Sequence, residues 1–140
     1  MAQDEGGLLK SYWRHWPRQV RGVLFTEVSI GKRSHGKIPR RIDGVRISLS
    51  APRIEKFRAH HTEFREVVVG KTIESIEVKK SLYRSVIGQA IVGKHLLEIE
   101  YGVAAAVPIV ICGSGDQLLE QVCARLGVKV WTPRKGFLVP

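Results

Sequence analysis

The chain has 140 residues, 44% of them hydrophobic and 26% charged, which suits one globular domain spanning residues 1–140. Its 23 Lys and Arg against 13 Asp and Glu leave a formal charge of +10, which favours nucleic acid as the partner, with general solubility or an anionic membrane surface as alternatives. Apolar runs are too short for a membrane span, and the acidic start does not resemble a signal peptide. We therefore expect an intracellular, cytoplasmic protein without a membrane partner.

Strand signals and Gly- or Pro-rich breaks alternate in the first half of the chain. β-branched and aromatic residues with period-two spacing predict strands, and Pro17 is expected to break or bend the first helix. The expected elements are a helix at 8–21, strands at 23–30 and 41–49 around a basic hairpin loop at 31–39, a short helix or ordered insertion at 53–66, and a third strand region at 67–69 and 72–79. Because loops join these strands, they can be antiparallel.

Helices alternate with strands in the second half. The expected elements are a helix from 81 to about 100, a strand at 103–112, a helix at 117–126, a strand at 128–132 and a loop at 133–140. The apolar face expected for the second of these helices consists of Leu118, Leu119, Val122 and Leu126. The Gly113–Asp116 segment before it reads as a tight turn, or as a phosphate site at the start of the helix. Helical crossovers make these strands parallel, so we expect an α/β fold with a mixed central sheet flanked by helices.

An acid follows apolar residues on one face of each of the three early strands. Side chains alternate with period two, so Glu27 is expected on the core face of the first strand and Asp43 on that of the second. Glu77 and Lys79 share a face of the third strand with apolar Ile73. If these strands are neighbours, three carboxylates and one amine converge at an edge of the core. Carboxylates that hold Mg²⁺ beside a lysine are the groups that phosphodiester hydrolysis requires.

Three segments occur in an order that is similar to a known family. They are residues 41–47 (RIDGVRI), residues 76–81 (IEVKKS) and Gly88-Gln89 within the expected long helix. Over roughly residues 23–112 the chain resembles the PD-(D/E)xK nuclease superfamily, with residues 51–66 as an insertion and Ile42 in place of the proline. The resemblance implies a restriction endonuclease-like core in the order α-β-β-β-α-β, followed here by an extra α-β unit.

The resemblance also implies roles for individual residues. Asp43 and Glu77 would be ligands of Mg²⁺ or Mn²⁺, and Lys79 would be the catalytic lysine. Glu27 matches an earlier acid that many members carry, and it would assist through the metal or a water molecule. Gln89 matches a helix glutamine that supports the site in other members.

Basic residues near these segments are candidate contacts to nucleic acid. They are Lys32, Arg33, Lys37, Arg40, Arg41 and Lys80. The hairpin loop that holds most of them either contacts phosphates beside the active site or is a solvated tip. Trp13 and Trp16 either stack on bases or anchor the first helix to the core.

Each candidate has a plain structural alternative. These are a solvated Glu77–Lys79 pair on an edge strand, an ion pair of Asp43 with Arg41 or Arg46, a surface Glu27, and a Gln89 amide satisfied by the backbone. At the level of function, we expect a DNA endonuclease that would need a homodimer, or two encounters, to cut both strands of a duplex. The alternatives are an inactive nucleic-acid-binding module or subunit of a larger nucleoprotein complex, and a basic structural or RNA-associated protein of unrelated fold.

Overall fold

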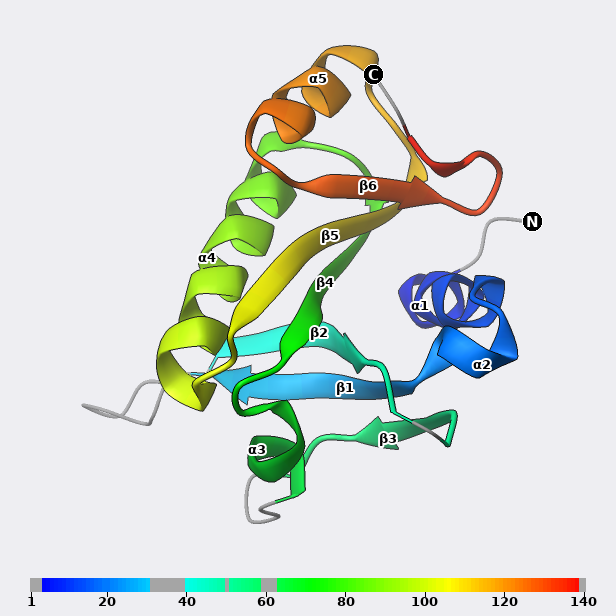
Figure 1. Ribbon diagram of the computed structural model, residues 1–140. Coiled ribbons are helices and arrows are strands. Elements are labelled where there is room, and N and C mark those ends of the chain that lie inside the picture. The colour runs from blue at the N-terminus through cyan, green and yellow to red at the C-terminus, as the bar shows by residue number, and fades with distance from the viewer. Residues whose placement is uncertain (1–3, 31–39, 50, 59–62, 139–140) are drawn as a thin grey trace.

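A computed structural model describes residues 4–30, 40–49, 51–58 and 63–138. Its strands are β1 (Val23–Ile30), β2 (Arg40–Ile47), β3 (Arg53–Lys56), β4 (Thr72–Ser81), β5 (Ala105–Ser114), β6 (Lys129–Thr132) and β7 (Gly136–Phe137). Its helices are α1 (Glu5–His15), α2 (Arg18–Arg21), α3 (Glu63–Val68), α4 (Arg84–Tyr101) and α5 (Gln117–Arg125). All seven strands join in one sheet, in the order β3-β1-β2-β4-β5-β6-β7 (Figure 1).

Strand direction in this sheet follows the type of connection. The hairpin β1–β2 and the pair β2–β4 are antiparallel. Beyond them, α4 links β4 to β5 and α5 links β5 to β6, and both pairs are parallel. The short edge strand β3 runs parallel to β1, and β7 folds back antiparallel on β6. The expected mixed α/β architecture is therefore confirmed, and the sheet extends beyond residue 112.

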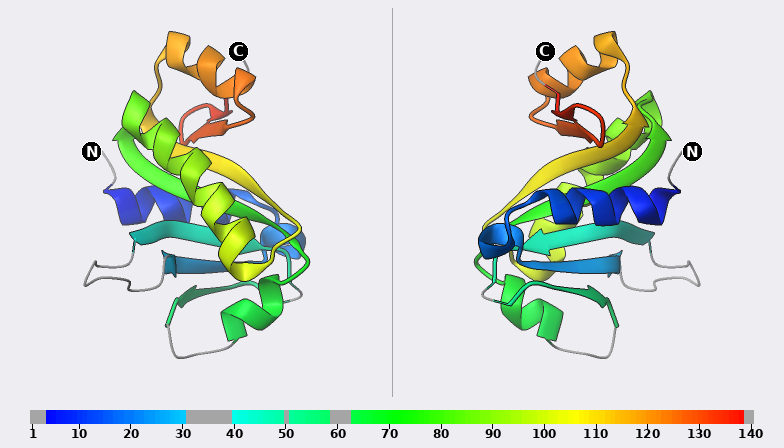
Figure 2. Two further views of the ribbon diagram at one scale, coloured as in Figure 1. Left: turned by 90° about the vertical axis from the view of Figure 1, so that its left-hand side faces the viewer. Right: turned by 90° about the vertical axis from the view of Figure 1, so that its right-hand side faces the viewer.

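Helices cover both faces of the sheet (Figures 1 and 2). On one face, α1 packs Leu8, Leu9 and Tyr12 against Ile109 and Ile111. On the other face, α3, α4 and α5 pack against alternating residues of the same strands, such as Val110 in β5 and Val130 in β6. The run Ile109–Cys112 is fully buried, as expected for a strand covered on both sides.

The N-terminal helix breaks where the proline predicts. Asp4 caps α1 by accepting a hydrogen bond from the Gly7 N–H at 2.6 Å, and the helix ends before Pro17. The Trp13 indole donates to the Gly22 carbonyl at 3.1 Å, and Trp16 packs at the margin of the α1-side core. Both tryptophans thus anchor this helix and the turn after it.

The region between β2 and β4 differs from the expected third strand at 67–69. Residues 63–68 form helix α3, in which Phe64 and Val68, four residues apart, are buried against β1 and α4. The β-branched run Val67–Val69 favours a strand locally, but this helical face buries two large side chains at once. The stretch 53–66 contains both a strand and the start of this helix, so the single-helix alternative is wrong.

The face that α5 buries also differs from expectation. Leu118, Val122 and Leu126 are 70%, 38% and 52% exposed, whereas Cys123 is completely buried. Leu119 only partly covers the core. The helix is short and sits at the end of the sheet, so it contacts β6 along a narrow strip that Cys123 occupies.

Within the described residues, no helix is long and apolar enough to cross a membrane.

Candidate active site

A pocket of about 530 Å³ lies between α4 and the strands β2 and β4. Asp43 from β2, Glu77 and Lys79 from β4, and Gln89 from α4 all line it. The sheet register accounts for this grouping. Gly44 pairs with Ile76 in antiparallel strands, so the residue before Gly44 in β2 lies beside the residue after Ile76 in β4. Four of the five side chains predicted for the site therefore meet in one cavity.

Asp43 lies where β2 and β4 separate. Ladder pairing between the strands ends at Gly44 and Ile76. One residue further, the Asp43 carboxylate takes the place of the backbone partner, accepting a hydrogen bond from the Val78 N–H at 2.8 Å. This bond fixes the carboxylate beside Glu77. In the described residues Asp43 has no ion pair, because Arg41 contacts Glu27 and Arg46 contacts Glu74.

Glu77 is a buried acid that faces another acid. It is only 7% exposed, and its side chain hydrogen-bonds to Asp43. Burial, then the charge of Asp43 and this hydrogen bond, raise the pKa of Glu77 to about 9, while the Lys79 amine acts in the opposite direction. A proton shared by two adjacent carboxyls satisfies the pair when no cation is present. The solvated-pair alternative for Glu77 is therefore wrong.

Two further residues shape the buried end of the pocket. Ser75 is completely buried on the same face of β4, and its hydroxyl has no hydrogen-bond partner in the described residues. A Cβ placed on Gly93 of α4 would lie 3.5 Å from both the Ser75 hydroxyl and the Glu77 carboxylate. The α4 backbone thus runs beside the acids at Gly93, with room for a methyl group in ordinary van der Waals contact. Ser75 lies two residues before Glu77, so strand alternation accounts for its face, whereas its burial depends on packing.

Glu27 does not join the other acids, which corrects the expected three-carboxylate convergence. Its backbone is left-handed, with φ 55°, and this breaks the period-two alternation of β1. Val28 and Ile30 consequently face the same core cluster as Val23 and Phe25. The exposed Glu27 carboxylate instead lies 3.2 Å from Lys56.

The neighbouring strand has a matching irregularity. Ile42 joins Val45, three residues later, in the same core cluster, so the period-two alternation used to predict the face of Asp43 does not hold along the whole of β2. A second cavity of about 260 Å³, on the α1 side of the sheet, is lined by both Glu27 and Asp43. Asp43 borders both cavities, whereas Glu77 lines only the pocket beside α4.

The remaining candidates separate into three groups. Arg40 and Arg41 line the pocket. Gln89 also lines it but is exposed on the surface of α4, so it is not a core amide. Lys80 is exposed and does not line the pocket. The hairpin-loop candidates lie outside the described residues; they are Lys32, Arg33 and Lys37.

The donor set is compatible with a hard divalent cation. Mg²⁺ commonly uses one or two protein carboxylates and keeps water or phosphate oxygens for its other positions. Asp43 and Glu77 supply two such carboxylates. Without a cation, the raised pKa of Glu77 means that a proton neutralises its charge, and a bound cation could take the place of that proton. Over the described ranges no cluster of three or more His, Cys, Asp or Glu suited to a metal is found, so any ion here would rest on these two side chains.

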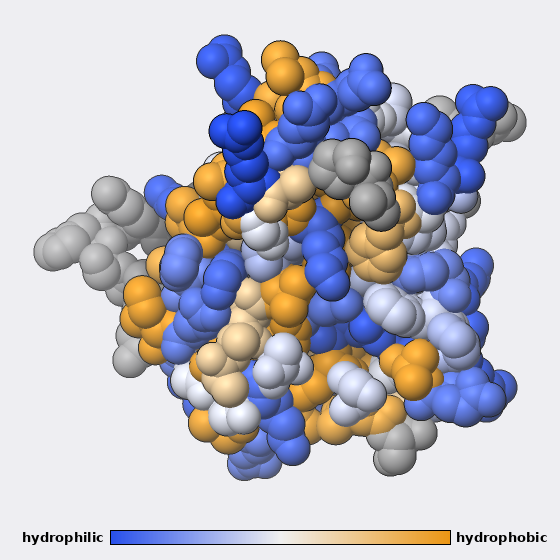
Figure 3. All heavy atoms as spheres, turned by 45° about the horizontal axis from the view of Figure 1, so that its top comes forward, coloured by the Kyte–Doolittle hydropathy of each residue, from blue (hydrophilic) through white to orange (hydrophobic). Residues whose placement is uncertain are grey.

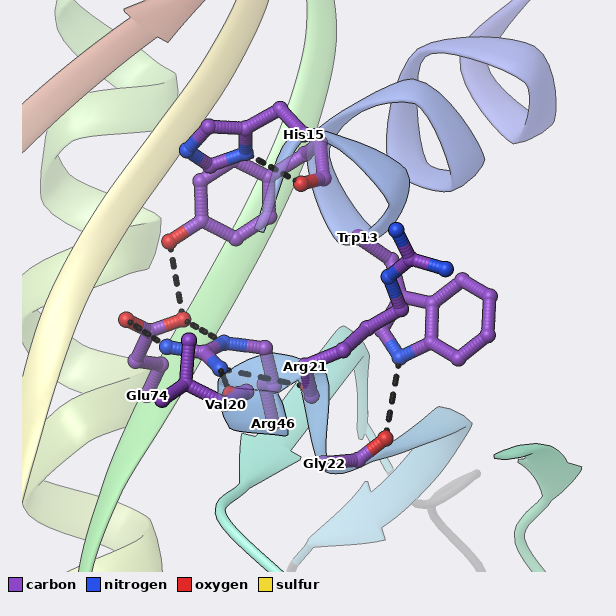
Figure 4. Close-up of polar contacts among 8 residues, drawn as sticks. Trp13, His15, Val20, Arg21, Gly22, Arg46 and Glu74 are labelled. Atoms are coloured by element: carbon purple, nitrogen blue, oxygen red, sulfur yellow. Dashed lines mark hydrogen bonds and ion pairs between the residues drawn. The ribbon is translucent and has the colours of Figure 1, made fainter. Parts of the chain in front are cut away.

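Another glutamate of β4, Glu74, is partly buried and lies beside Arg46 and α1 (Figure 4). Arg46 donates two hydrogen bonds to Glu74, at 2.7 and 2.9 Å, and the Tyr12 hydroxyl donates a third at 2.8 Å. Arg46 also donates to the Val20 carbonyl at 2.8 Å and stacks on the Trp16 ring at 4.2 Å. This network joins α1, α2, β2 and β4, and no sequence signal had singled it out.

The pKa shifts in this network follow from its pairing. Burial alone lowers the pKa of Arg46, but the hydrogen bonds and charge of Glu74 outweigh it and raise the value. Burial and the Glu74 carboxylate also raise the pKa of Tyr12. Both side chains therefore keep their protons across the physiological range.

Comparison with protein-family models, with curated proteins and with solved structures finds no match to this chain.

Proposed function

We propose that this protein is a metal-dependent nuclease that hydrolyses phosphodiester bonds, most readily as a DNA endonuclease. The observation that carries the proposal is the buried Glu77 carboxyl beside Asp43, with Lys79 in the same pocket. Buried acids are costly unless something compensates their charge. Strongly shifted pKa values of this kind cluster at functional sites.

The arrangement of elements supports assignment to the PD-(D/E)xK superfamily. Helix α1, strands β1, β2 and β4, helix α4 and strand β5 follow one another in the order α-β-β-β-α-β, with β3 and α3 inserted between β2 and β4. The acids and the lysine come from the second and third strands of that series, and the glutamine from the helix that follows. A restriction endonuclease-like core, extended by α5 and β6, is accordingly part of the proposal.

Asp43 and Glu77 would hold the Mg²⁺ or Mn²⁺ ion. When bound there, the ion supplies Lewis-acid activation and neutralises negative charge on the phosphate. The Val78 N–H holds the Asp43 carboxylate in place. Glu77 must give up its proton to take part, and the Lys79 amine beside it favours the ionised form.

Lys79 and the cations at the pocket entrance act on the substrate directly. The Lys79 amine would orient the attacking water and stabilise charge that develops on the phosphate. Arg40 and Arg41 line the same pocket and can contact phosphates on either side of the reacting one. Gln89 can hydrogen-bond to the substrate or to water at the pocket edge. Glu27, which faces the other cavity, has no direct part in this mechanism.

The substrate follows from the charge of the whole chain. A formal charge of +10 attracts a polyanion and yields salt-dependent affinity. One chain carries one site, so cleavage of both strands of a duplex would use a homodimer or two encounters.

A nicking assay with adjacent lysines tests the proposal. Purified protein with Mg²⁺ or Mn²⁺ should relax supercoiled plasmid, and Lys79→Ala should slow nicking by about 10²–10⁴-fold. Lys80→Ala is the matched control, because Lys80 is the next residue, carries the same charge and does not line the pocket. DNA binding, measured by fluorescence anisotropy in EDTA, should be similar in both variants. Equal nicking by the two variants would remove Lys79 from the chemistry.

A catalytically inactive nucleic-acid-binding module is the second candidate. It is favoured by the position of Glu27, which leaves the pocket with two carboxylates instead of three. This alternative predicts salt-sensitive DNA binding without cleavage in Mg²⁺, Mn²⁺ or Ca²⁺. Calorimetry with Mn²⁺ separates the two, because the nuclease should bind the ion and lose that binding on Asp43→Asn.

A further inference from the structure

A cavity larger than the pocket of the acid pair lies away from it. It is a cleft of about 860 Å³ at the carboxyl ends of β5 and β6, closed on one side by the first turns of α5. Its lining includes Ser114, Gln117, Thr132, Arg134, Lys135 and Phe137. Crevices beyond the carboxyl ends of parallel strands are a common position for ligands in α/β folds.

The turn between β6 and β7 presents two cations to this cleft. Thr132 is buried, and its hydroxyl accepts a hydrogen bond from the Lys135 N–H at 3.2 Å, which closes the turn. The backbone of this turn is therefore held without the side chains of Arg134 or Lys135. Both side chains are exposed, and neither forms an ion pair within the described part of the chain.

One acid also lines the cleft. Among the described lining residues Glu120 is the one carboxylate. Its oxygen lies 2.5 Å from the position that a Cβ on Gly115 would occupy, so it packs against the Gly113–Gly115 loop. The face of the molecule that carries α5 and the β6–β7 hairpin displays hydrophilic side chains with hydrophobic ones between them (Figure 3). Within the described residues, neither Arg134 nor Lys135 forms an ion pair with Glu120.

We propose that this cleft binds the phosphate backbone of a nucleic-acid strand, close to the cutting site. Pockets for small molecules are mostly apolar and enclosed, whereas this cleft is open and lined mostly by polar side chains. Exposed and unpaired cations of this kind contact phosphates and contribute to salt-dependent affinity. The proposal rests on the proposed nuclease function for its position relative to the cleaved bond, but the binding itself does not require cleavage.

The sheet sets the spacing between the two sites. Lys79 pairs with Cys112 across β4 and β5, and the cleft wall begins at the next residue of β5, Gly113. The strands that form the cleft walls, β5 and β6, are thus the first and second neighbours of β4 in the sheet.

Binding measurements with a matched pair of double variants test the proposal. In EDTA, a labelled 20-nucleotide single strand and its duplex are titrated with wild type, with Arg134→Ala/Lys135→Ala, and with Arg14→Ala/Lys71→Ala. The control removes the same two charge types from exposed positions outside the cleft. The cleft variant should lose about tenfold in affinity for at least one form and reduce the salt slope by about 1.5 to 2, and the control should change affinity by less than about threefold. Equal losses in the two variants overturn the proposal.

Two further arms separate other outcomes. A nucleoside triphosphate and inorganic phosphate should displace the oligonucleotide only at millimolar concentration. Displacement by low concentrations of the triphosphate alone would show a nucleotide pocket and overturn the nucleic-acid assignment. In nicking assays, the cleft variant should raise KM and leave kcat unchanged. If wild type binds through the cleft but never nicks, the proposed nuclease function fails and the cleft proposal stands.

Discussion

Glu74 and Glu77 lie three residues apart on β4 and face opposite sides of the sheet. The charged side chains nearest to them have opposite signs. Glu74 accepts hydrogen bonds from Arg46 and Tyr12, so its negative charge is compensated inside the fold. Glu77 meets another carboxylate, and its pKa rises to about 9. The comparison teaches that burial alone does not mark a functional acid. An acid that the fold itself compensates serves stability, and one left beside a second acid is available to a cation or substrate.

The largest expected difference between the two glutamates is in activity. Glu77→Gln should reduce nicking by roughly 10³-fold, because it removes a cation ligand worth several kcal/mol in the transition state. Glu74→Gln should retain nicking within about threefold at temperatures where the protein stays folded, since Glu74 lies on the far side of the sheet. Rates are measured on supercoiled plasmid with circular dichroism as the check on folding. Loss of activity in a fully folded Glu74→Gln would break the distinction.

The second difference is in stability. Arg46→Met should lower the free energy of unfolding by about 2 to 4 kcal/mol, because it leaves the partly buried Glu74 carboxylate without its cation. Exchanging both partners, Arg46→Met with Glu74→Leu, should recover most of that loss, since no unpaired charge is left behind. Urea denaturation of the single and double variants measures both values. A single variant as stable as wild type would show that Glu74 is not held by Arg46.

The third difference is the pH dependence of the metal-free protein. The pKa of Glu77 in the folded state, about 9, lies above its ordinary value of 4.5, so between those values the folded state binds more protons than the unfolded state. The contribution of Glu77 to the free energy of unfolding is therefore fully present below about pH 4.5. It declines as pH rises toward 9, by at most about 1.4 kcal/mol per pH unit. Glu77→Gln should remove this decline and unfold at higher urea than wild type at pH 8. Parallel pH profiles for the two proteins would contradict the assignment.

The smallest expected effect concerns Glu27, the acid that stays outside the pocket. Glu27→Gly should keep nicking within about twofold and match or exceed wild-type stability, because glycine adopts its positive φ without strain and the lost ion pairs are exposed. Glu27→Ala should be less stable than Glu27→Gly by about 1 kcal/mol. A large loss of nicking in the glycine variant would return Glu27 to the mechanism.

Some features could be predicted because they depend on neighbours along the chain. The apolar run at Ile109–Cys112, the helix break at Pro17 and the strand that carries Glu77 and Lys79 follow from local pattern, and Figure 1 displays the resulting order of elements. Others could not. A single left-handed residue at Glu27 reverses the face of everything after it in β1. The end position of α5 likewise leaves Leu118 exposed, although its spacing suits a buried face.

The sequence by itself determined the charge, the alternation of helices and strands, and the short list of acids and amines from which a site could be built. Tertiary structure alone decided which of them meet. Asp43 and Glu77 become neighbours only because β2 and β4 pair and then separate, and Glu74 is neutralised only because α1 and β2 bring Tyr12 and Arg46 to it. The physical reason is that side-chain pKa and hydrogen bonding depend on distances across strands, which no local pattern encodes.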